Sequence, residues 1–277
     1  MALLLRRTTR RRQPTVPLAI DPQHDIGRSV IEAGYMLGAR TGYSASTRRI
    51  LVPSILGSGT ITAAVTIGGA ATKLNATSSA NCSFINLGRS FSHSSGTGIT
   101  MLWRGVINSL SVLIPLFTSA SDGVAQWPGH YLSVNTAGTF FGAYGDTSGT
   151  GTSAYRRATS STTLTVGQFY TIAAVCRGAT DWSLYVDGVS QGAPSYSGSG
   201  GYAAGTANGA INRRDDSGQQ TVNSWLYLSR ALADAEIQSL YEAPFQFLMP
   251  IRRRVWVAVN SGGAVTMGGL LLMGCGS

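Results

Sequence analysis

The chain is a succession of short apolar segments separated by glycine-rich turns, and this feature constrains its fold more than any other. The main segments span residues 59–69, 98–107, 130–146, 164–178, 181–192 and 221–229. Their apolar residues do not recur at helical spacing. Short strands at fairly regular intervals, with turns between them, predict an antiparallel sandwich or barrel.

Two segments show the alternation that a strand with two different faces requires. In residues 99–104, Ile, Met and Trp alternate with Thr, Leu and Arg. In residues 182–186, Trp, Leu and Val alternate with Ser and Tyr. Asp187 and Gly188 follow the second run, and Asp-Gly is a favoured two-residue hairpin turn. A β-hairpin is therefore predicted here.

Length and composition are compatible with one large sandwich. A chain of 277 residues is within the size range of a single β-domain. Hydrophobic residues make up 43% of it, which is enough for a sizeable core, whereas charged residues make up only 12%. The surface must therefore consist largely of hydroxyls, amides and glycine backbone.

Residues 230–248 are the exception, because acidic and aliphatic residues there fall at helical spacing and the run meets Pro244. The stretch 224–248, "SWLYLSRALADAEIQSLYEAPFQFL", resembles the closing segment of laminin-G-like domains of the concanavalin A-like superfamily. In that family a last strand leads through an Arg-Ala-Leu turn into a short helix with a Leu-Tyr pair. Residues 169–192 resemble the central hairpin of the family, and residues 98–107 fit an earlier core strand.

The resemblance covers roughly residues 84–250 and implies an all-β, two-sheet antiparallel jelly-roll sandwich with one short C-terminal helix. The helix is expected to plug the edge or end of the sandwich, with Leu240 and Tyr241 packed against the sheet. Members of the family often have Ser where this chain has Ala233. Glu236 can still accept a bond from the backbone, but the reciprocal bond from a hydroxyl is lost.

A second resemblance concerns the two ends of the chain. Residues 243–259, "APFQFLMPIRRRVWVAV", are similar to the run that follows this domain in laminin-G-like proteins of tailed bacteriophages, and "RRRQP" at residues 10–14 is similar to their opening. The resemblance implies a virion protein that is made in the host cytoplasm. No apolar run is long enough for a signal peptide or a membrane span.

These features predict three parts of the chain. Residues 1–24 form a basic extended N-terminal arm, residues 25–250 the jelly-roll domain, and residues 251–277 an Arg-rich strand and an apolar Gly-rich tail. The net charge is +9, and much of the arginine lies near the ends. The expected assembly anchors are Arg10, Arg11, Arg12, Arg252, Arg253 and Arg254.

The expected partners of these anchors are other virion proteins and further copies of the chain. Clustered arginine also binds phosphate. The sequence has neither aromatic residues interleaved with the arginines nor a helical motif that reads bases, so nucleic acid is not expected as a partner. A membrane is not expected either.

Catalytic residues in a recognisable pattern are missing from the sequence. A glycoside hydrolase on this fold would need paired carboxylates, yet the three glutamates (Glu32, Glu236 and Glu242) do not form such a pair. No Gly-x-Ser-x-Gly elbow precedes a helix. We therefore expect a protein that is not an enzyme.

Metal and disulfide chemistry is not expected. Cys82, Cys176 and Cys275 have no metal-binding spacing, so three reduced thiols are predicted, with Cys176 buried in a strand. Calcium is the alternative to the absence of any cofactor, since some relatives bind it. Its candidate ligands are the loop carboxylates Asp122, Asp146, Asp187, Asp215 and Asp216. Asp187 is better explained as a residue of the hairpin turn, and Asp215 and Asp216 as partners of the neighbouring arginines.

A glycan site would combine exposed aromatic rings with planar polar groups. The loops offer the aromatic residues Trp127, Tyr155, Tyr196 and Tyr202 and the arginines Arg156, Arg157, Arg213 and Arg214. The leading candidate residues are Trp127, Tyr155, Tyr202 and Arg213. The alternative interpretation is that the tyrosines cover the ends of the sandwich or contact neighbouring subunits.

Two functions are open at this point. The first is a non-enzymatic phage virion protein that displays a concanavalin A-like domain, in the tail or baseplate with an adhesive role or as a capsid decoration. The second is a soluble carbohydrate-binding lectin module that recognises host-surface glycans.

Overall fold

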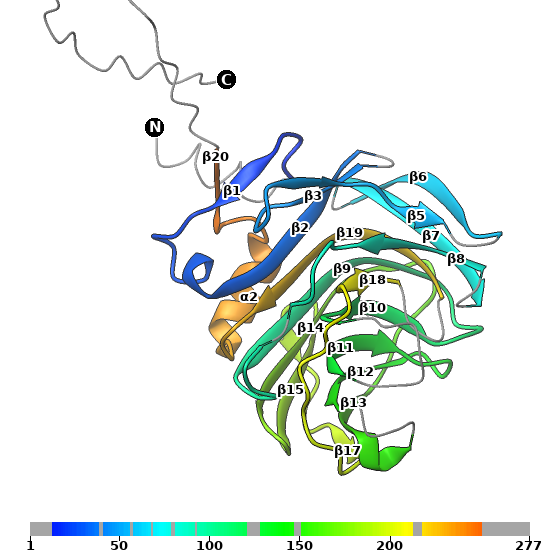
Figure 1. Ribbon diagram of the computed structural model, residues 1–277, viewed down its shortest axis with the longest axis vertical. Helices are drawn as coiled ribbons and strands as arrows, with labels where there is room; N and C mark the ends of the chain where they lie inside the picture. Colours follow the sequence, from blue (N-terminus) through cyan, green and yellow to red (C-terminus); the bar gives the residue numbers. More distant parts are fainter. Residues whose placement is uncertain are drawn as a thin grey trace, which may run out of the picture.

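The structure is a computed structural model that describes residues 13–38, 41–55, 58–67, 69–78, 81–91, 93–120, 128–146, 151–212 and 218–250. The described chain forms two antiparallel sheets packed face to face, a short helix and a two-stranded ribbon (Figure 1). The predicted all-β, two-sheet sandwich with one short C-terminal helix is confirmed. The anchor arginines at positions 10–12 and 252–254 lie outside the described residues.

The first sheet contains the longest strands of the molecule. Its spatial order is β4 (Arg49–Leu51), β3 (Thr41–Ser44), β2 (Val30–Gly38), β19 (Gln219–Leu228), β9 (Ile99–Ser109), β14 (Phe169–Gly178), β15 (Asp181–Val186) and β16 (Val189–Ser190). The first part of β19 pairs instead with β7 (Gly69–Ser78), and β6 (Thr60–Thr66) lies outside β7. The strands β2 and β7 therefore share one edge of β19.

The second sheet faces the first across the core. Its spatial order is β8 (Asn81–Asn86), β18 (Ala210–Ile211), β10 (Ile114–Thr118), β11 (Gly129–Val134), β12 (Thr139–Gly145), β13 (Tyr155–Thr163) and β17 (Ser195–Ser197). The short strand β5 (Ser54–Ile55) pairs with β8, which also continues from β7. A 3-10 turn, η2 (Thr152–Ala154), precedes β13.

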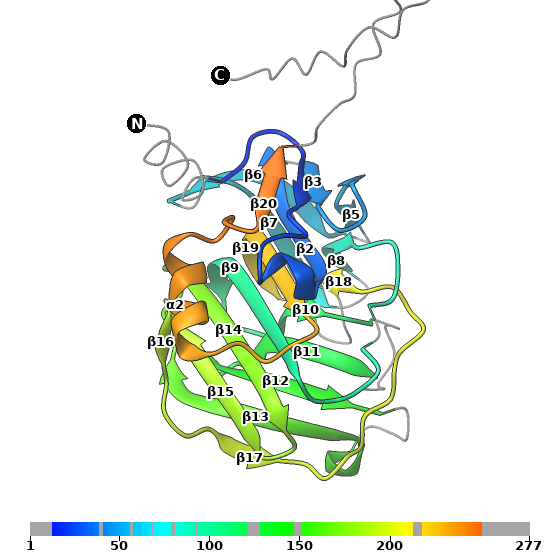
Figure 2. The same cartoon turned by 90° about the vertical axis from the view of Figure 1, so that its left-hand side faces the viewer.

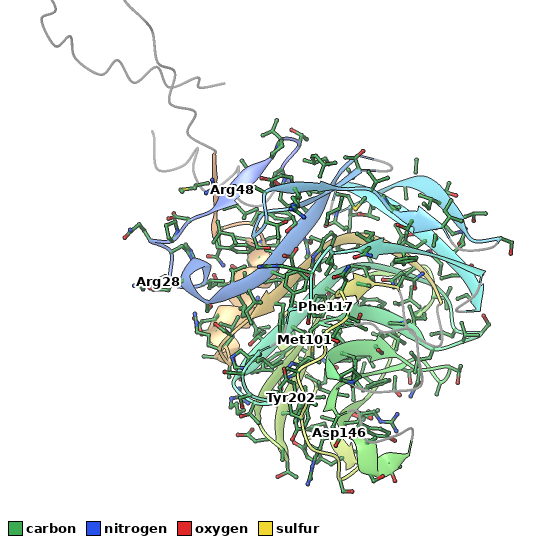
Figure 3. The ribbon with its side chains drawn as sticks, viewed as in Figure 1. Arg28, Arg48, Met101, Phe117, Asp146 and Tyr202 are labelled. Carbon is green, nitrogen blue, oxygen red and sulfur yellow. The ribbon has the colours of Figure 1, made fainter. Side chains whose placement is uncertain are left out.

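The core between the sheets follows from the alternation in the strands. Met101 and Trp103 point from β9 toward the second sheet, and Trp182 and Leu184 do so from β15. Phe117 on β10 meets them from the opposite sheet, and Figure 3 shows Met101 and Phe117 in the interior. The burial of these large side chains is the main stabilising term for such a sandwich.

The predicted hairpin is present at the end of β15. Val186 pairs with Val189, so Asp187 and Gly188 are the two turn residues. Their φ angles of 50° and 83° are both positive, as a type I′ turn requires. The Oδ1 atom of Asp187 accepts the backbone N–H of Thr171 at 2.8 Å, which fixes the turn against β14.

The helix α2 (Asp234–Glu242) covers the outer face of the first sheet, and the expectation that it plugs an edge or end of the sandwich is wrong (Figures 1 and 2). The reason is that the central strands are apolar on both faces: Leu102, Ala173 and Leu226 point outward from β9, β14 and β19. Ile237 and Leu240 of the helix bury these side chains. The sheet needs a third layer, and α2 supplies part of it.

The start of α2 has the half-complete cap that the sequence predicts. The Oε2 atom of Glu236 accepts the N–H of Ala233 at 3.0 Å. The methyl group of Ala233 cannot accept a bond in return. Leu240 is 1% exposed as expected, whereas Tyr241 is 38% exposed because it lies on the outer side of the helix.

Residues from the predicted N-terminal arm contact the domain. The strands β1 (Leu18–Ile20) and β20 (Leu248–Pro250) form an antiparallel ribbon in which Leu18 lies opposite Pro250. The hydroxyl of Tyr35 accepts the N–H of Leu18 at 2.8 Å and donates to the carbonyl of Val16 at 2.9 Å. The boundary expected at residues 24 and 25 falls inside this packed region, because strands far apart in sequence meet there.

Candidate binding site

Two of the four leading candidate glycan residues are described by the structure. Tyr155 begins β13, and Tyr202 lies in the segment that follows β17. Trp127 and Arg213 lie outside the described residues. Both tyrosines are at the end of the sandwich that is farthest from the β1–β20 ribbon, where Figure 3 marks Tyr202 and Asp146.

The ring of Tyr202 is used in packing. Its centroid lies 4.8 Å from that of His130 and 6.1 Å from that of Tyr144. The Tyr202 hydroxyl donates to the carbonyl of His93 at 2.7 Å. A partly buried ring with a satisfied hydroxyl closes the end of the core, which agrees with the alternative interpretation of the loop tyrosines.

His130, beneath Tyr202, is a satisfied core histidine. Its Nε2–H donates to the carbonyl of Gly96 at 3.1 Å, and its Nδ1 accepts the hydroxyl proton of Tyr227 at 2.9 Å. Because a carbonyl can only accept, Nε2 carries a proton, and in the neutral ring Nδ1 is then the acceptor. Burial lowers the pKa of His130 to about 3, so the ring is neutral near pH 7. This histidine is not positioned as a base for an external substrate.

Arg157, on β13, has the most distinctive geometry at this end of the molecule. Its guanidinium carbon lies 5.0 Å from the ring centroid of Phe141 and 5.4 Å from that of Tyr155. Its Nε donates to the hydroxyl of Ser197 at 3.1 Å. Two rings and one hydrogen bond thus fix the plane of the guanidinium group.

The strand register explains why these groups meet. Ala143 pairs with both Tyr131 and Arg157, and Arg157 pairs with Ser197, so all four point to the same side of the second sheet. That side is the outer one, since the neighbouring residues Leu132, Phe140 and Tyr144 point into the core. We refer to Phe141, Tyr155, Arg157 and Ser197 together as the Arg157 site.

The Arg157 site is a fixed cation with no acidic partner among the residues that the structure describes. The ion pairs found within the described residues involve Arg28, Arg177 and Arg230, and none involves Arg157. Phe141 is fully buried and Tyr155 is 8% exposed, so the rings support the guanidinium from beneath. The remaining guanidinium N–H groups can donate to oxygen atoms of a ligand.

The sequence offered Arg156 and Arg157 together as candidates for a glycan site and did not distinguish between them. Arg156 and Arg157 are adjacent, so only one of them can share a face with Phe141. The pairing of Phe141 with Thr159 selects Arg157, which lies two residues away on the same face. Predicting this choice required the register between β12 and β13.

Tyr196 is the most exposed aromatic side chain near the site, at 43%. It lies on β17 and pairs with Ala158. Its hydroxyl accepts the backbone N–H of Trp182 at 3.1 Å and so links the edges of the two sheets. Its side chain shares the face of Ala158 and so lies on the opposite face of the sheet from Arg157.

The one fully buried carboxylate among the described residues does not form a catalytic pair. Glu32 lies between strands β2, β3 and β19, where Ser44 and Ser46 donate hydroxyl protons to its Oε2. The Nε1–H of Trp225 points to its Oε1 at 3.4 Å. Burial raises the pKa of Glu32 to about 7. Hydroxyls and an indole surround it, and a glycosidase would need a second carboxylate there.

In the part of the chain that the structure describes, no group of three or more His, Cys, Asp or Glu side chains could hold a metal ion. Asp187 is used in its hairpin, and the Oδ2 atom of Asp146 accepts the N–H of Gly201 at 3.2 Å. The other calcium candidates, Asp122, Asp215 and Asp216, lie outside the described residues.

Cys176 is free and buried in β14, as the sequence predicts. Burial raises the pKa of its thiol to about 12, so the thiol is protonated and unreactive in the folded chain.

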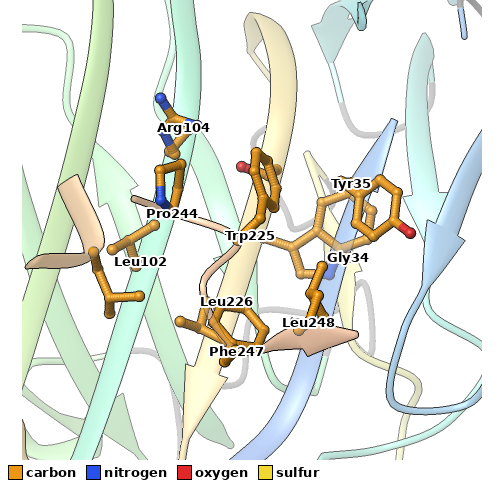
Figure 4. Close-up of a pocket in the computed structure, with 13 residues that line it drawn as sticks. Gly34, Tyr35, Leu102, Arg104, Trp225, Leu226, Pro244, Phe247 and Leu248 are labelled. Atoms are coloured by element: carbon orange, nitrogen blue, oxygen red, sulfur yellow. The ribbon is translucent and has the colours of Figure 1, made fainter. Parts of the chain in front are cut away.

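Two cavities on the first sheet are unsuited to a ligand. The enclosed one, beneath the segment that follows α2, has a volume of about 10 Å³, which is room for about one water molecule (Figure 4). The open one lies between α2 and a 3-10 turn, η1 (Gly27–Ser29), and measures about 560 Å³. Its charged side chains pair with one another, as Arg28–Asp25 and Arg230–Glu236.

The described residues contain no helix that combines the length and the apolar character needed to cross a membrane.

Comparisons with known proteins define the fold and leave the family open. No protein-family model matches the chain, and no curated protein matches it significantly. Solved structures do match the chain. The binding domain of Paraclostridial Mosquitocidal Protein 1 has a TM-score of 0.54 and 12% sequence identity, and the match covers 77% of this chain and 52% of that one. The receptor binding domain of botulinum neurotoxin D gives a TM-score of 0.52 and 12% identity over 79% of this chain and 54% of that one.

A third example is the binding domain of botulinum neurotoxin serotype G, with a TM-score of 0.52 and 12% identity over 76% of this chain and 50% of that one. The chain spans about half the length of these structures. At such identities the likeness concerns the fold alone. The chain therefore has the fold of all-β receptor-binding domains.

Proposed function

We propose that this chain is a non-catalytic adhesion domain of a tailed-bacteriophage virion and that it binds a host-surface glycan through the Arg157 site. One observation carries the proposal: the described chain begins and ends at one end of the sandwich, and the Arg157 site lies at the other (Figures 1 and 2). A domain held at the β1–β20 ribbon presents the Arg157 site outward. This arrangement suits a displayed binding module.

The chemistry of the site supports a glycan as the ligand. A planar guanidinium group donates to sugar oxygens in a fixed direction. Ser195 and Ser197 add hydroxyls on the same short strand. The fold likeness to receptor-binding domains supports a binding role over a catalytic one.

The virion setting rests on the sequence. The run at residues 243–259 and the arginines near both ends are similar to those of laminin-G-like phage proteins. In the ribbon, Leu18 near the start of the described chain lies opposite Pro250 at its end. Mass spectrometry of purified particles tests this part of the proposal, since a soluble lectin would be absent from them.

The glycan part is tested with the full chain on a broad glycan array. Wild type should bind at least one glycan class, and Arg157→Gln should weaken that binding by about tenfold or more, because a hydrogen bond to a charged group contributes about 1.5–3 kcal/mol. Arg156→Gln is the matched control, since Arg156 lies on the opposite face of β13. Its affinity should stay within about twofold of wild type, on the same energy scale. Absence of wild-type binding, or equal binding by Arg157→Gln, would contradict the proposed site.

A further inference from the structure

The strand β4, at one edge of the first sheet, carries two exposed aliphatic side chains. Ile50 is 54% exposed, and Val52 just beyond the strand is 67% exposed. Leu51 between them belongs to the core between the sheets, so Ile50 and Val52 point to the opposite, outer side. Ile50 pairs with Tyr43, which belongs to the apolar cluster on the outer face. The outer face of the first sheet therefore ends at β4 in exposed apolar side chains.

Arg48, in the turn before β4, adds a positive charge to this surface (Figure 3). It is exposed, and none of the ion pairs within the described residues includes it. Its charge acts on the phenol of Tyr43, which places it on the same side as Ile50. Its φ angle of 55° lies in the left-handed region, where glycine is less strained, so the turn itself does not favour arginine. We refer to Arg48, Ile50 and Val52 together as the Arg48 patch.

The outer side of α2 presents the opposite charge beside an exposed ring. Tyr241 is 38% exposed, and the next residue, Glu242, is exposed as well. Gln238 donates its amide to the Oε1 atom of Glu242 at 3.1 Å, and no ion pair within the described residues neutralises this carboxylate. Val189 is 62% exposed and adjoins the ring, since a β-carbon at Gly188 would be 3.1 Å from the Cβ atom of Tyr241. We refer to Val189, Tyr241 and Glu242 together as the Tyr241 patch.

We propose that the Arg48 patch of one copy of this chain binds the Tyr241 patch of a second copy, so that copies associate head to tail. The guanidinium of Arg48 pairs with the carboxylate of Glu242, and the aliphatic side chains of the first copy cover the ring of Tyr241 in the second. Figures 1 and 2 show β3 and α2 well apart in both views, so the two patches of one copy do not contact each other. Each patch therefore needs a second copy.

The charges of the chain favour this orientation over others. Each copy has a net charge of +9, so two copies repel in most orientations. The helix α2 contains three acidic residues and no basic one, so it attracts the Arg48 patch of a neighbour. The patches are small, which makes the contact weak and sensitive to salt. Neither patch includes a residue of the second sheet, so the Arg157 site of every copy stays uncovered and several sites can act together on one surface.

The first test is sedimentation equilibrium of the full chain at low salt, up to a concentration of about 1 mM. Wild type should associate, and Arg48→Glu should raise the dissociation constant by about tenfold or more, because like charges then oppose each other. Arg49→Glu is the matched control, since it makes the same change in net charge at an exposed position. Arg49 pairs with Ser44, whose hydroxyl donates to Glu32, so its side chain points to the other side of β4. Its dissociation constant should stay within about twofold of wild type, and all three chains should unfold at similar temperatures.

The second test mixes two variants that are defective in different patches. Glu242→Arg alone should associate as weakly as Arg48→Glu alone. An equimolar mixture of the two should regain association close to that of wild type, because each introduced charge then meets its opposite on the other variant. A wild type that stays monomeric up to about 1 mM would overturn the proposal. It would also be overturned by an Arg49→Glu defect as large as that of Arg48→Glu, or by a mixture that associates no better than its components.

Discussion

The indole of Trp225 lies directly on Gly34 of the neighbouring strand, so close that a β-carbon at Gly34 would be 2.1 Å from the Cζ2 atom of the ring. Trp225 is 1% exposed and packs in the core between the sheets. The absence of a side chain at Gly34 thus creates the space that the indole occupies. A methyl group there would have to displace a large, fully packed ring.

Gly34→Ala should therefore destabilise the domain by roughly 1–3 kcal/mol, the usual cost of overpacking a core. Denaturant unfolding measures the difference. Gly151→Ala is the control, because its nearest neighbour, the Oγ of Ser153, would be 3.8 Å from the new methyl group. That variant should be neutral or slightly more stable, and an equal loss in both would show that the contact with Trp225 is not the cause.

Glu32 should make stability depend on pH. Its pKa is about 7 in the folded chain, against an ordinary value of 4.5, because burial disfavours the carboxylate. The folded state therefore binds the proton more tightly. The stability that comes from the protonated form is complete below pH 4.5 and is lost as the pH rises to 7.

Glu32→Gln should remove this dependence, because its amide stays neutral. The variant should be more stable than wild type at pH 8, by roughly 2–3 kcal/mol, and similar to it at pH 4. Denaturation midpoints at the two pH values give the comparison. Glu242→Gln, on the exposed side of α2, should show the same small effect at both. A Glu32→Gln effect that is equal at pH 4 and pH 8 would be evidence against a buried, protonated carboxyl group.

Ala233→Ser should stabilise the domain by about 0.5–1 kcal/mol, because a hydroxyl at this exposed position can accept a backbone N–H of the first turn. Glu236 already supplies the other half of the capping box. Ala235→Ser, two residues further on and also exposed, should cost about 0.5 kcal/mol through helix propensity. A gain in stability for Ala233→Ser with a loss for Ala235→Ser would place the cap at residue 233. A loss of stability in both variants would exclude a cap there.

The N-terminal residues should contribute to stability from residue 13 onward. A chain that spans residues 13–250 should unfold cooperatively, and one that spans 25–250 should be less stable because it loses β1 and exposes the apolar side chains beneath it. Tyr35→Phe isolates one contact, since it removes the bonds to Leu18 and Val16. We expect a cost of about 1–2 kcal/mol. Equal stability of the two truncated chains would restore the boundary at residue 25.

Some features of the fold were predictable because they are local. The alternation in residues 99–104 and 182–186 predicts both faces of β9 and β15, and Asp187-Gly188 predicts the hairpin. Helical spacing and Glu236 likewise predict α2 and its half cap. In each case the signal and the structure lie within a few residues of each other.

The features that were missed depend on contacts between distant segments. The position of α2 depends on outward-facing apolar residues from β9, β14 and β19, which are brought together only by the sheet. Arg157 was one of the sequence candidates, but its contacts with Phe141 and Ser197 depend on the register of β12, β13 and β17. Tyr202 has the residue type of a sugar platform, and only the position of His130 beneath it shows that its ring is used in packing.

The β1–β20 ribbon also makes the domain suitable for insertion into another protein. Leu18 and Pro250 are cross-strand partners, so the chain enters and leaves the fold at points about 5 Å apart. That gap is similar to the spacing at the mouth of a β-hairpin. A protein engineer could therefore splice residues 18–250 into an exposed hairpin loop of an unrelated scaffold, with short flexible joints and without forcing the host strands apart. The sandwich would then project from the scaffold as a side branch, with its far end free.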